Sequence, residues 1–288
     1  MQINPEESTR DWDLVIQPKS RWLELQLREV WRYRDLLLLF VKRDFIAQYK
    51  QTILGPLWHF INPIFTTLTY TFVFGNIAKL STDGTPQLVF YMSGITIWNL
   101  FAQTLTSTGS TFLSNSGIFG KVYFPRLVSP LATALSKTIM FAIQLLLLIC
   151  FVGYYKWNGQ LTSMHWVNLI YLPIIVILMS GFGLGLGFIL SSLTTKYRDL
   201  NVLIGFGINL FMYTTPIIYP LSSVPDNYRF LLEWNPVSPL IEFFRYLFTG
   251  AGTFTLYSLC YSATMTLVFL FLGMLIFNRV EKTFMDSV

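Results

Sequence analysis

The sequence predicts an all-α integral membrane protein with six transmembrane helices, an N-terminal amphipathic interface helix and two short re-entrant or periplasmic helices between spans five and six. Of its 288 residues 53% are hydrophobic and 12% charged, and the mean hydropathy is +0.52, far from the values of soluble domains. Six apolar runs each supply the roughly 20 residues that cross a hydrocarbon core of about 30 Å. These runs are Leu57–Ile77, Leu88–Phe112, Leu131–Tyr155, Trp166–Leu193, Leu200–Tyr219 and Leu256–Phe277.

The positions of the cations predict the orientation. Most of the 20 Lys and Arg residues precede the first span, lie in the loops after spans two and four, or follow the last span. Because Lys and Arg are retained on the cytoplasmic side, both termini are expected in the cytosol. The net charge of +5 then reflects topology rather than nucleic acid binding. The first fifty residues hold no short apolar run with a cleavage site, so a cleaved secretory signal is not expected.

Residues 1–52 are expected to be a cytoplasmic N-terminal segment and residues 53–288 the six-span domain. The segment Arg21 to Lys50 has an amphipathic helical pattern. One face carries Leu37, Leu38, Val41, Phe45 and Tyr49, and the other carries Arg32, Arg43 and Lys50. This pattern predicts a helix lying along the membrane, with its cationic face toward lipid headgroups or a cytosolic partner. A further transmembrane span is the alternative, but the apolar centre Leu36–Val41 is short for one.

Spans one to three carry side chains whose helical spacing permits either packing or a substrate path. Span one holds an aromatic and polar row, Thr66, Tyr70 and Phe74, and span two holds a polar row, Asn99, Gln103, Thr106 and Ser110. Polar groups in hydrocarbon are costly unless they face other helices or a cavity. In span three Lys137 is expected to extend toward the cytoplasmic boundary of the membrane.

Spans four and five differ in their small residues. Span four holds two overlapping G-x-x-x-G pairs, Gly181 with Gly185 and Gly183 with Gly187, which predict close helix packing. One face of span five is the strongest candidate for the lining of a central path, and it holds Asn201, Gly205, Asn209, Tyr213 and Pro216. Four prolines between Tyr219 and Leu256 divide that region into two short amphipathic pieces.

Energy conversion is expected on another chain. No G-x-x-x-x-G-K-[ST] loop occurs, and the apolar runs hold no Asp or Glu for a proton or sodium relay. Neither a catalytic nor a metal-binding residue is expected, because Cys150 and Cys260 lie in apolar runs and His59 and His165 are far apart. The loop Ser114–Arg126 is expected to face the cytosol, where a partner could act on it.

Four motifs and the order of the parts resemble a known family. The motifs are Gly120-Lys121-x-x-Phe124-Pro125-Arg126, Tyr197-Arg198-Asp199, Trp234-Asn235-Pro236 and the ending Phe277-Asn278-Arg279-Val280-Glu281. From about Leu27 onward the chain is similar to the transmembrane subunit of polysaccharide-exporting ABC transporters, the ABC-2 type permeases. Its proportions and ending resemble those of O-antigen permeases first and of teichoic acid permeases second; capsule export is the third branch.

The resemblance implies a homodimer in the bacterial inner membrane, joined to two copies of a separate ATPase subunit that holds ATP and Mg, with no cofactor in this chain. The dimer would export an undecaprenyl-diphosphate-linked polysaccharide. Ser114–Arg126 would be the coupling or gate helix docked on the ATPase, with contacts from Phe119, Lys121, Tyr123, Phe124, Pro125 and Arg126. Arg32–Lys50 would be the interface helix.

Substrate contacts follow from the same resemblance. Aromatic residues at the outer ends of spans one and five, namely Tyr70, Phe74, Tyr213 and Tyr219, would stack on sugars. The basic residues Arg43, Lys50, Lys121 and Arg126 would meet the lipid diphosphate. Replacement of Lys121 and Arg126 with Ala is expected to abolish export and to leave the protein folded.

Two other functions remain open from the sequence. An ABC-2 permease for a drug or small amphiphile would enclose a mainly apolar pocket. A membrane-embedded glycan-modifying enzyme would need carboxylates at a cleft, and the acidic residues outside the spans on that side are Asp83, Asp226, Glu233 and Glu242.

Overall fold

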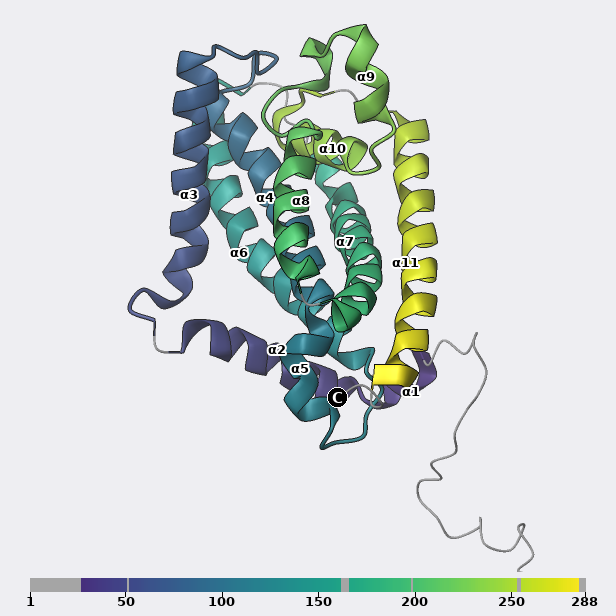
Figure 1. Cartoon of the computed structure of the whole chain (residues 1–288). Helices are drawn as coiled ribbons and strands as arrows, with labels where there is room; N and C mark the ends of the chain where they lie inside the picture. Colours follow the sequence, from purple (N-terminus) through teal and green to yellow (C-terminus); the bar gives the residue numbers. More distant parts are fainter. Residues whose placement is uncertain (1–26, 51, 162–165, 198, 253–254, 285–288) are drawn as a thin grey trace, which may run out of the picture.

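The computed structural model describes residues 27–50, 52–161, 166–197, 199–252 and 255–284. Its elements in chain order are α1 (Leu27–Arg32), α2 (Arg34–Tyr49), η1 (Gly55–Leu57), α3 (Trp58–Tyr70), η2 (Thr71–Ile77), α4 (Gln87–Gly109), α5 (Thr111–Phe119), α6 (Val128–Trp157), η3 (Trp166–Tyr171), α7 (Leu172–Lys196), α8 (Leu200–Tyr213), η4 (Leu221–Ser223), α9 (Asp226–Glu233), α10 (Ser238–Thr249) and α11 (Leu256–Phe284). Figure 1 shows a bundle of long helices, with α2 and α5 across one end and α9 and α10 across the other. We call these the α5 end and the α10 end.

Four helices are long and apolar enough to cross a membrane: α4, α6, α7 with the turns that precede it, and α11. They confirm the predicted spans two, three, four and six. The predicted first span is helical throughout, but it divides into α3 and the wider π-helical turns of η2.

The predicted end of span five at Tyr219 is wrong, because α8 ends at Tyr213. The backbone N–H groups of Thr214 and Thr215 donate to carbonyls three residues back, which tightens the last turn. Pro216 has no N–H with which to continue the helix. The chain therefore leaves the bundle axis before the position that hydropathy alone indicates.

Two other boundaries also differ from the prediction. Span two ends at Gly109 rather than at Phe112, and the residues that follow Ser110 form α5, so the predicted loop Ser114–Arg126 begins as a helix. The last helix continues past the predicted end at Phe277 to Phe284. The two short pieces predicted between spans five and six are present as α9 and α10, but α10 is largely buried and α9 is exposed.

Two hydrophobic cores hold the helices together. The main core joins α4, α6 and α7 with the apolar face of α10, so α10 closes its end of the bundle (Figure 1). The second core, which we call the α5-end core, joins α2, α5, the turn before α6 and the last turns of α11. Aromatic rings dominate the α5-end core: Phe112 stacks on Phe277 with ring centroids 4.7 Å apart, and Phe119 lies 6.0 Å from Phe112.

The glycines of α7 pack against two different neighbours, as the overlapping pairs predict. A Cβ atom at Gly185 would lie 2.7 Å from the backbone of Phe269 and Leu270 on α11. One at Gly187 would lie 2.5 Å from Cβ of Thr108 on α4. Since the pairs alternate in sequence, one helix can approach two neighbours on opposite sides, and the packing prediction is confirmed.

Replacement of Gly273 with Ala is expected to destabilise the protein by about 1–3 kcal/mol, the usual cost of overpacking. The new Cβ would collide with the backbone carbonyl of Gly185, an atom that cannot move without displacing α7. The matched control is Gly207→Ala on α8, where no atom lies within 4 Å of the added Cβ. Thermal unfolding of the two variants in detergent measures the difference, and equal unfolding temperatures would contradict the observed packing.

Candidate functional site: the polar hollow and the α5 turn

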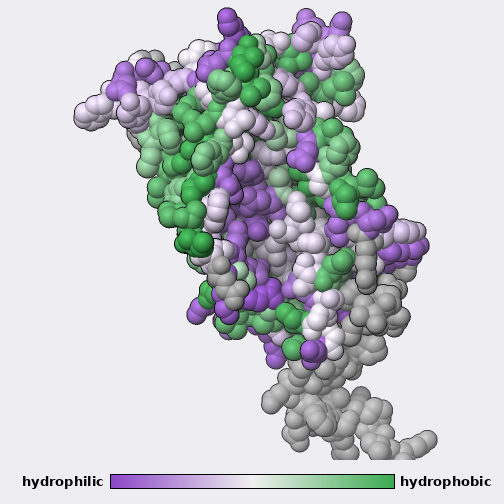
Figure 2. Space-filling view, turned by 60° about the vertical axis from the view of Figure 1, so that its left-hand side comes forward, coloured by the Kyte–Doolittle hydropathy of each residue, from purple (hydrophilic) through white to green (hydrophobic). Residues whose placement is uncertain are grey.

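A hollow with hydrophilic side chains in its floor and hydrophobic side chains on both sides runs along one face of the bundle (Figure 2). α3 stands at the edge of the bundle and packs against α4 and α6, while α8 packs against α4 and α7 (Figure 1). α4 therefore lies between α3 and α8, and its outward side chains face the space between them.

The polar row predicted on span two lies on this outward side of α4. Asn99, Gln103 and Ser110 are partly exposed and Thr106 is exposed. In the described part of the chain, an interhelical hydrogen bond from this row joins Asn99 Nδ2 to Gln144 Oε1 on α6, at 3.3 Å. Thr106 and Ser110 donate to carbonyls of α4 itself. The row thus offers hydroxyl and amide groups to the hollow.

The predicted aromatic contacts gather where α3 and α8 approach each other near the α10 end. The hydroxyl of Tyr70 lies 3.7 Å from Sδ of Met212, and its ring lies 5.4 Å from that of Phe74. The hydroxyl of Tyr219 donates to the carbonyl of Tyr213 at 2.7 Å. Tyr70 and Phe74 are half-buried against the main core, whereas Tyr213 is exposed. Their role in contacting sugars stays a prediction.

α8 has no buried residue, although it is strongly apolar. Asn209 is exposed one turn before Tyr213, and Asn201 is partly exposed at the opposite, α5 end of the same helix. The exposed apolar side chains on α8 are Val202, Leu203, Phe206 and Leu210. In the single chain, no other part of the protein covers much of this apolar surface of α8.

Five of the six residues predicted to contact a partner at the α5 end divide into two groups. Phe119, Phe124 and Pro125 are buried, and the ring of Phe124 lies 5.7 Å from that of Phe119 and 5.4 Å from that of Phe40 on α2. Lys121 and Tyr123 are exposed at the tip of the turn. Only the tip residues are therefore accessible to a second protein.

Arg126 is built into the α5-end core rather than exposed for substrate. Its guanidinium donates to the backbone carbonyl of Glu281 on α11, lies 4.0 Å from the carboxylate of the same residue, and covers the ring of Phe119 at 5.7 Å. Burial lowers the pKa of Arg126, and the carboxylate of Glu281 raises it in part. Arg126 is thus partly buried and paired, and the expectation that a Lys121 and Arg126 double variant stays folded remains a prediction.

The interface helix also differs in its orientation from the prediction. Arg32 and Lys50 are exposed as expected, but Arg43 faces α5, where its guanidinium donates to Asn115 Oδ1 at 3.2 Å and to Asp44 at 2.7 Å. Leu38, predicted on the apolar face, is exposed in the single chain, as a side chain in contact with lipid would be. The face that packs on the α5-end core is centred on Phe40 and Val41.

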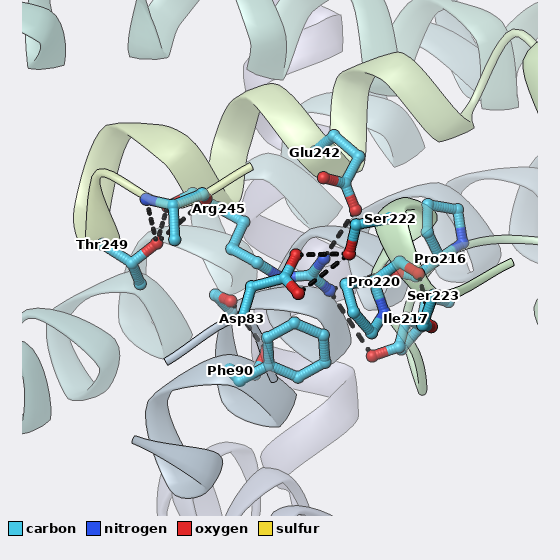
Figure 3. Close-up of polar contacts among 12 residues, drawn as sticks. Asp83, Phe90, Pro216, Ile217, Pro220, Ser222, Ser223, Glu242, Arg245 and Thr249 are labelled. Carbon is cyan, nitrogen blue, oxygen red and sulfur yellow. Dashed lines mark hydrogen bonds and ion pairs between the residues drawn. The ribbon is translucent and has the colours of Figure 1, made fainter. Parts of the chain in front are cut away.

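Sequence reasoning missed a buried charge pair at the α10 end. Arg245 Nη1 donates to Glu242 Oε1 at 2.7 Å, and both side chains are 2% exposed. Arg245 Nη2 donates to the carbonyl of Pro216 at 2.7 Å, and the guanidinium covers the ring of Phe90 at 3.8 Å (Figure 3). In the sequence, the one indication of this pair was that Glu242 and Arg245 are three residues apart, a spacing at which side chains on a helix can meet.

The same network holds the chain after α8 in place. Ser222 donates to the carboxylate of Asp83 in the loop before α4 (Figure 3). In the Trp234-Asn235-Pro236 motif, Asn235 Oδ1 accepts from the N–H of Val237 at 3.0 Å and Nδ2 donates to the carbonyl of Thr214 at 3.1 Å. The motif therefore ties the start of α10 to the end of α8.

Several predicted residues lie outside the part of the chain that the structure describes. They include Arg198 of the Tyr-Arg-Asp motif, His165, and the N-terminal cations Arg10, Lys19 and Arg21. The two flanking residues of the motif, Tyr197 and Asp199, lie in the turn between α7 and α8.

Comparisons with known proteins cover most of the chain. Residues 35–249 match the family described as ABC-2 type transporter. A Klebsiella pneumoniae protein named O-antigen export system permease protein RfbA is 30% identical over 253 residues, which are 88% of this chain and 94% of that protein. RfbA of Myxococcus xanthus is 27% identical over 265 residues, 91% and 98% of the two chains. The polysialic acid transport protein KpsM of Escherichia coli is 23% identical over 245 residues, 85% and 93% of the two chains.

Proposed function

The chain belongs to the ABC-2 type transporter family, and from this premise we propose that it is the membrane subunit of an ATP-driven exporter of lipid-linked polysaccharide, with O-antigen as the first candidate. The observation that carries the proposal is the likeness over nearly the full length of relatives named for O-antigen export and polysialic acid transport. Its family is one of transporters, so the chain acts in transport rather than as an enzyme. Teichoic acid remains the second candidate polymer.

The topology proposed here has six spans, with both termini in the cytosol of a bacterium and the bundle in its inner membrane. Four long apolar helices support it directly. α3 and η2 together form one helical stretch, Trp58–Ile77, of nearly the length that a span needs. α8 is short for a span, and the chain after it turns into η4, α9 and α10, which are admissible at membrane depth where protein covers them. The predicted concentration of cations at the α5 end supports the orientation.

A second copy of the chain is proposed to cover α8 and to close the hollow into a path. The uncovered apolar surface of α8 and the open hollow beside it support this assembly (Figure 2). Two copies of a separate ATPase subunit, holding ATP and Mg, are proposed to dock at the α5 ends. The exposed tip that carries Lys121 and Tyr123 is the part of the α5 turn available for that contact.

The hydrophilic floor of the hollow favours a hydroxylated substrate over a small apolar one. Asn99, Gln103, Thr106 and Ser110 offer donors and acceptors to sugar hydroxyls. A pocket for an apolar drug would be lined mainly by hydrophobic side chains. The alternative of a drug permease is therefore the weaker proposal.

Deletion of the gene in its host tests the proposal. Surface polysaccharide is expected to disappear while lipid-linked polysaccharide accumulates in the inner membrane, and a plasmid copy is expected to restore export. Normal surface polysaccharide in the deletion strain would contradict the proposed function. Extraction of the lipid-linked pool distinguishes a block in export from a block in synthesis, because a synthesis defect would leave no accumulated polymer.

A further inference from the structure

Lys137 occupies an unusual position in the bundle. In the described parts of the long helices α3, α4, α6, α7, α8 and α11, it is the one charged side chain more than two turns from a helix end. A cation at this depth is costly unless an anion, a polar cavity or water compensates it. The groups around the ammonium of Lys137 therefore indicate its role.

The side chain points into the bundle and not along the outer surface of α6. It lies on the same face as Met140 and Gln144, which are buried, while Leu135, Ile139 and Leu146 are exposed on the other side. Lys137 Nζ lies 3.8 Å from Sδ of Met140, which is one turn closer to the α10 end. This contact places the ammonium group beside a buried side chain of α6.

The register of α4 against α6 places Lys137 beside the polar row. The two helices run in opposite directions, and the hydrogen bond from Asn99 to Gln144 fixes their pairing. Lys137 lies two turns from Gln144 toward the α5 end, and Thr106 lies two turns from Asn99 in the same direction. Lys137 and Gln144 are seven residues apart, as are Asn99 and Thr106. The two residues of each pair therefore lie on the same face of their helix. Lys137 and Thr106 therefore share one level of the hollow.

Negative charge from the protein does not neutralise this cation by direct contact. Among the described residues Lys137 forms no ion pair. The carboxylate of Asp44 on α2 is near enough to interact electrostatically, but it already pairs with Arg43 at 2.7 Å. His59 on α3 is the other titratable neighbour, and its Nε2 lies 3.3 Å from Nε2 of Gln48.

We propose that Lys137 is an anion-binding residue of the hollow and that it takes the diphosphate of the lipid-linked substrate, with the side-chain amide of Gln103 in the neighbouring polar row as a further donor. This inference rests on the proposed function. A lysine ammonium is a compact point charge with three donors, which suits phosphate oxygens. A hollow flanked by apolar helices would strengthen that contact, because the charge–charge attraction grows as water is excluded.

Binding measurements on the permease with its ATPase partner in phosphatidylcholine nanodiscs test the inference. The probe is radiolabelled undecaprenyl diphosphate, and undecaprenol is the phosphate-free comparison. Lys137→Gln is expected to weaken binding of the diphosphate by at least about tenfold, the effect of losing one charge-assisted hydrogen bond. Lys137→Arg, which keeps the charge, is expected to bind within about threefold of wild type. The matched control is Lys156→Gln, the same change of charge at the α10 end of the same helix, and it is expected to bind like wild type.

The possible results distinguish a failure of this inference from a failure of the proposed function on which it rests. If wild type binds the diphosphate and Lys137→Gln binds it equally well, the site is overturned and the exporter is not. If wild type binds neither the diphosphate nor a lipid-linked polysaccharide, both fail. Equal binding of undecaprenol, or full competition by phosphatidylglycerol added to the nanodiscs, would overturn the assignment to the substrate diphosphate. Thermal unfolding checks the variant: removal of an uncompensated cation is expected to leave the unfolding temperature unchanged or higher, whereas a structural lysine would lower it.

Discussion

Replacement of Glu242 with Ala is expected to destabilise the folded protein by about 3–5 kcal/mol, because it leaves a buried guanidinium without its carboxylate. Arg245 is 2% exposed, and its other contacts are two backbone carbonyls and the ring of Phe90. A loss of this size is a large share of the stability of an average domain. The expected result is a marked fall in the unfolding temperature and in the yield from the membrane.

The neighbouring helix supplies a matched control for that experiment. Arg229 and Glu233 on α9 also form a close pair, with the Nε and Oε1 atoms 2.9 Å apart, but the side chains are 40% and 53% exposed. Glu233→Ala is expected to cost less than about 1 kcal/mol, because exposed ion pairs contribute little. The double variant Glu242→Leu with Arg245→Met is expected to recover much of the loss, since apolar residues can replace a buried pair. Equal effects of Glu242→Ala and Glu233→Ala would contradict the buried network.

Replacement of Tyr123 with Ala is expected to abolish export and to leave the protein folded. The side chain is 65% exposed at the tip of the α5 turn and takes no part in the α5-end core. Large aromatic residues at interfaces cost about 2 kcal/mol or more when they are truncated, so the permease should release its ATPase partner. Co-purification of the partner, surface polysaccharide and the unfolding temperature are the three measurements.

Two further variants serve as controls for Tyr123→Ala. Tyr228→Ala removes a tyrosine of similar exposure, 63%, at the opposite α10 end and is expected to keep the ATPase bound. Phe124→Ala removes a buried ring of the α5-end core and is expected to lower stability by about 3–5 kcal/mol. Normal co-purification and export with Tyr123→Ala would show that the partner does not dock on this tip.

Hydropathy and glycine spacing were sufficient to predict much of the fold. α4, α6, α7 and α11 follow from the length of their apolar runs, and the alternating glycines of α7 follow from their spacing. Helix ends were predicted less well, because they depend on local hydrogen bonds such as those of Thr214 and Thr215 before Pro216. A window average of hydropathy does not contain that information.

The direction of single side chains could not be predicted from the sequence. The broad apolar run of α2 permits several covered faces, and contact with α6 and the turn before it selects the one centred on Phe40 and Val41. Arg126 and Arg245 look like surface cations by composition, yet each has a partner contributed by a distant part of the chain. Tertiary neighbours of this kind decide whether a cation is a contact for a ligand or part of the core.

Proteoliposomes that contain the purified permease and its ATPase partner test most directly whether this chain exports lipid-linked polysaccharide with energy from another protein. Lipid-linked polysaccharide is incorporated on the side that carries the ATPase, and its appearance on the other side is followed with a lectin or a glycosidase. ATP-dependent appearance is expected with wild type, and none is expected without the ATPase or with Tyr123→Ala. Failure of the complete complex to move the polymer, or equal movement without ATPase and ATP, would contradict the proposed function.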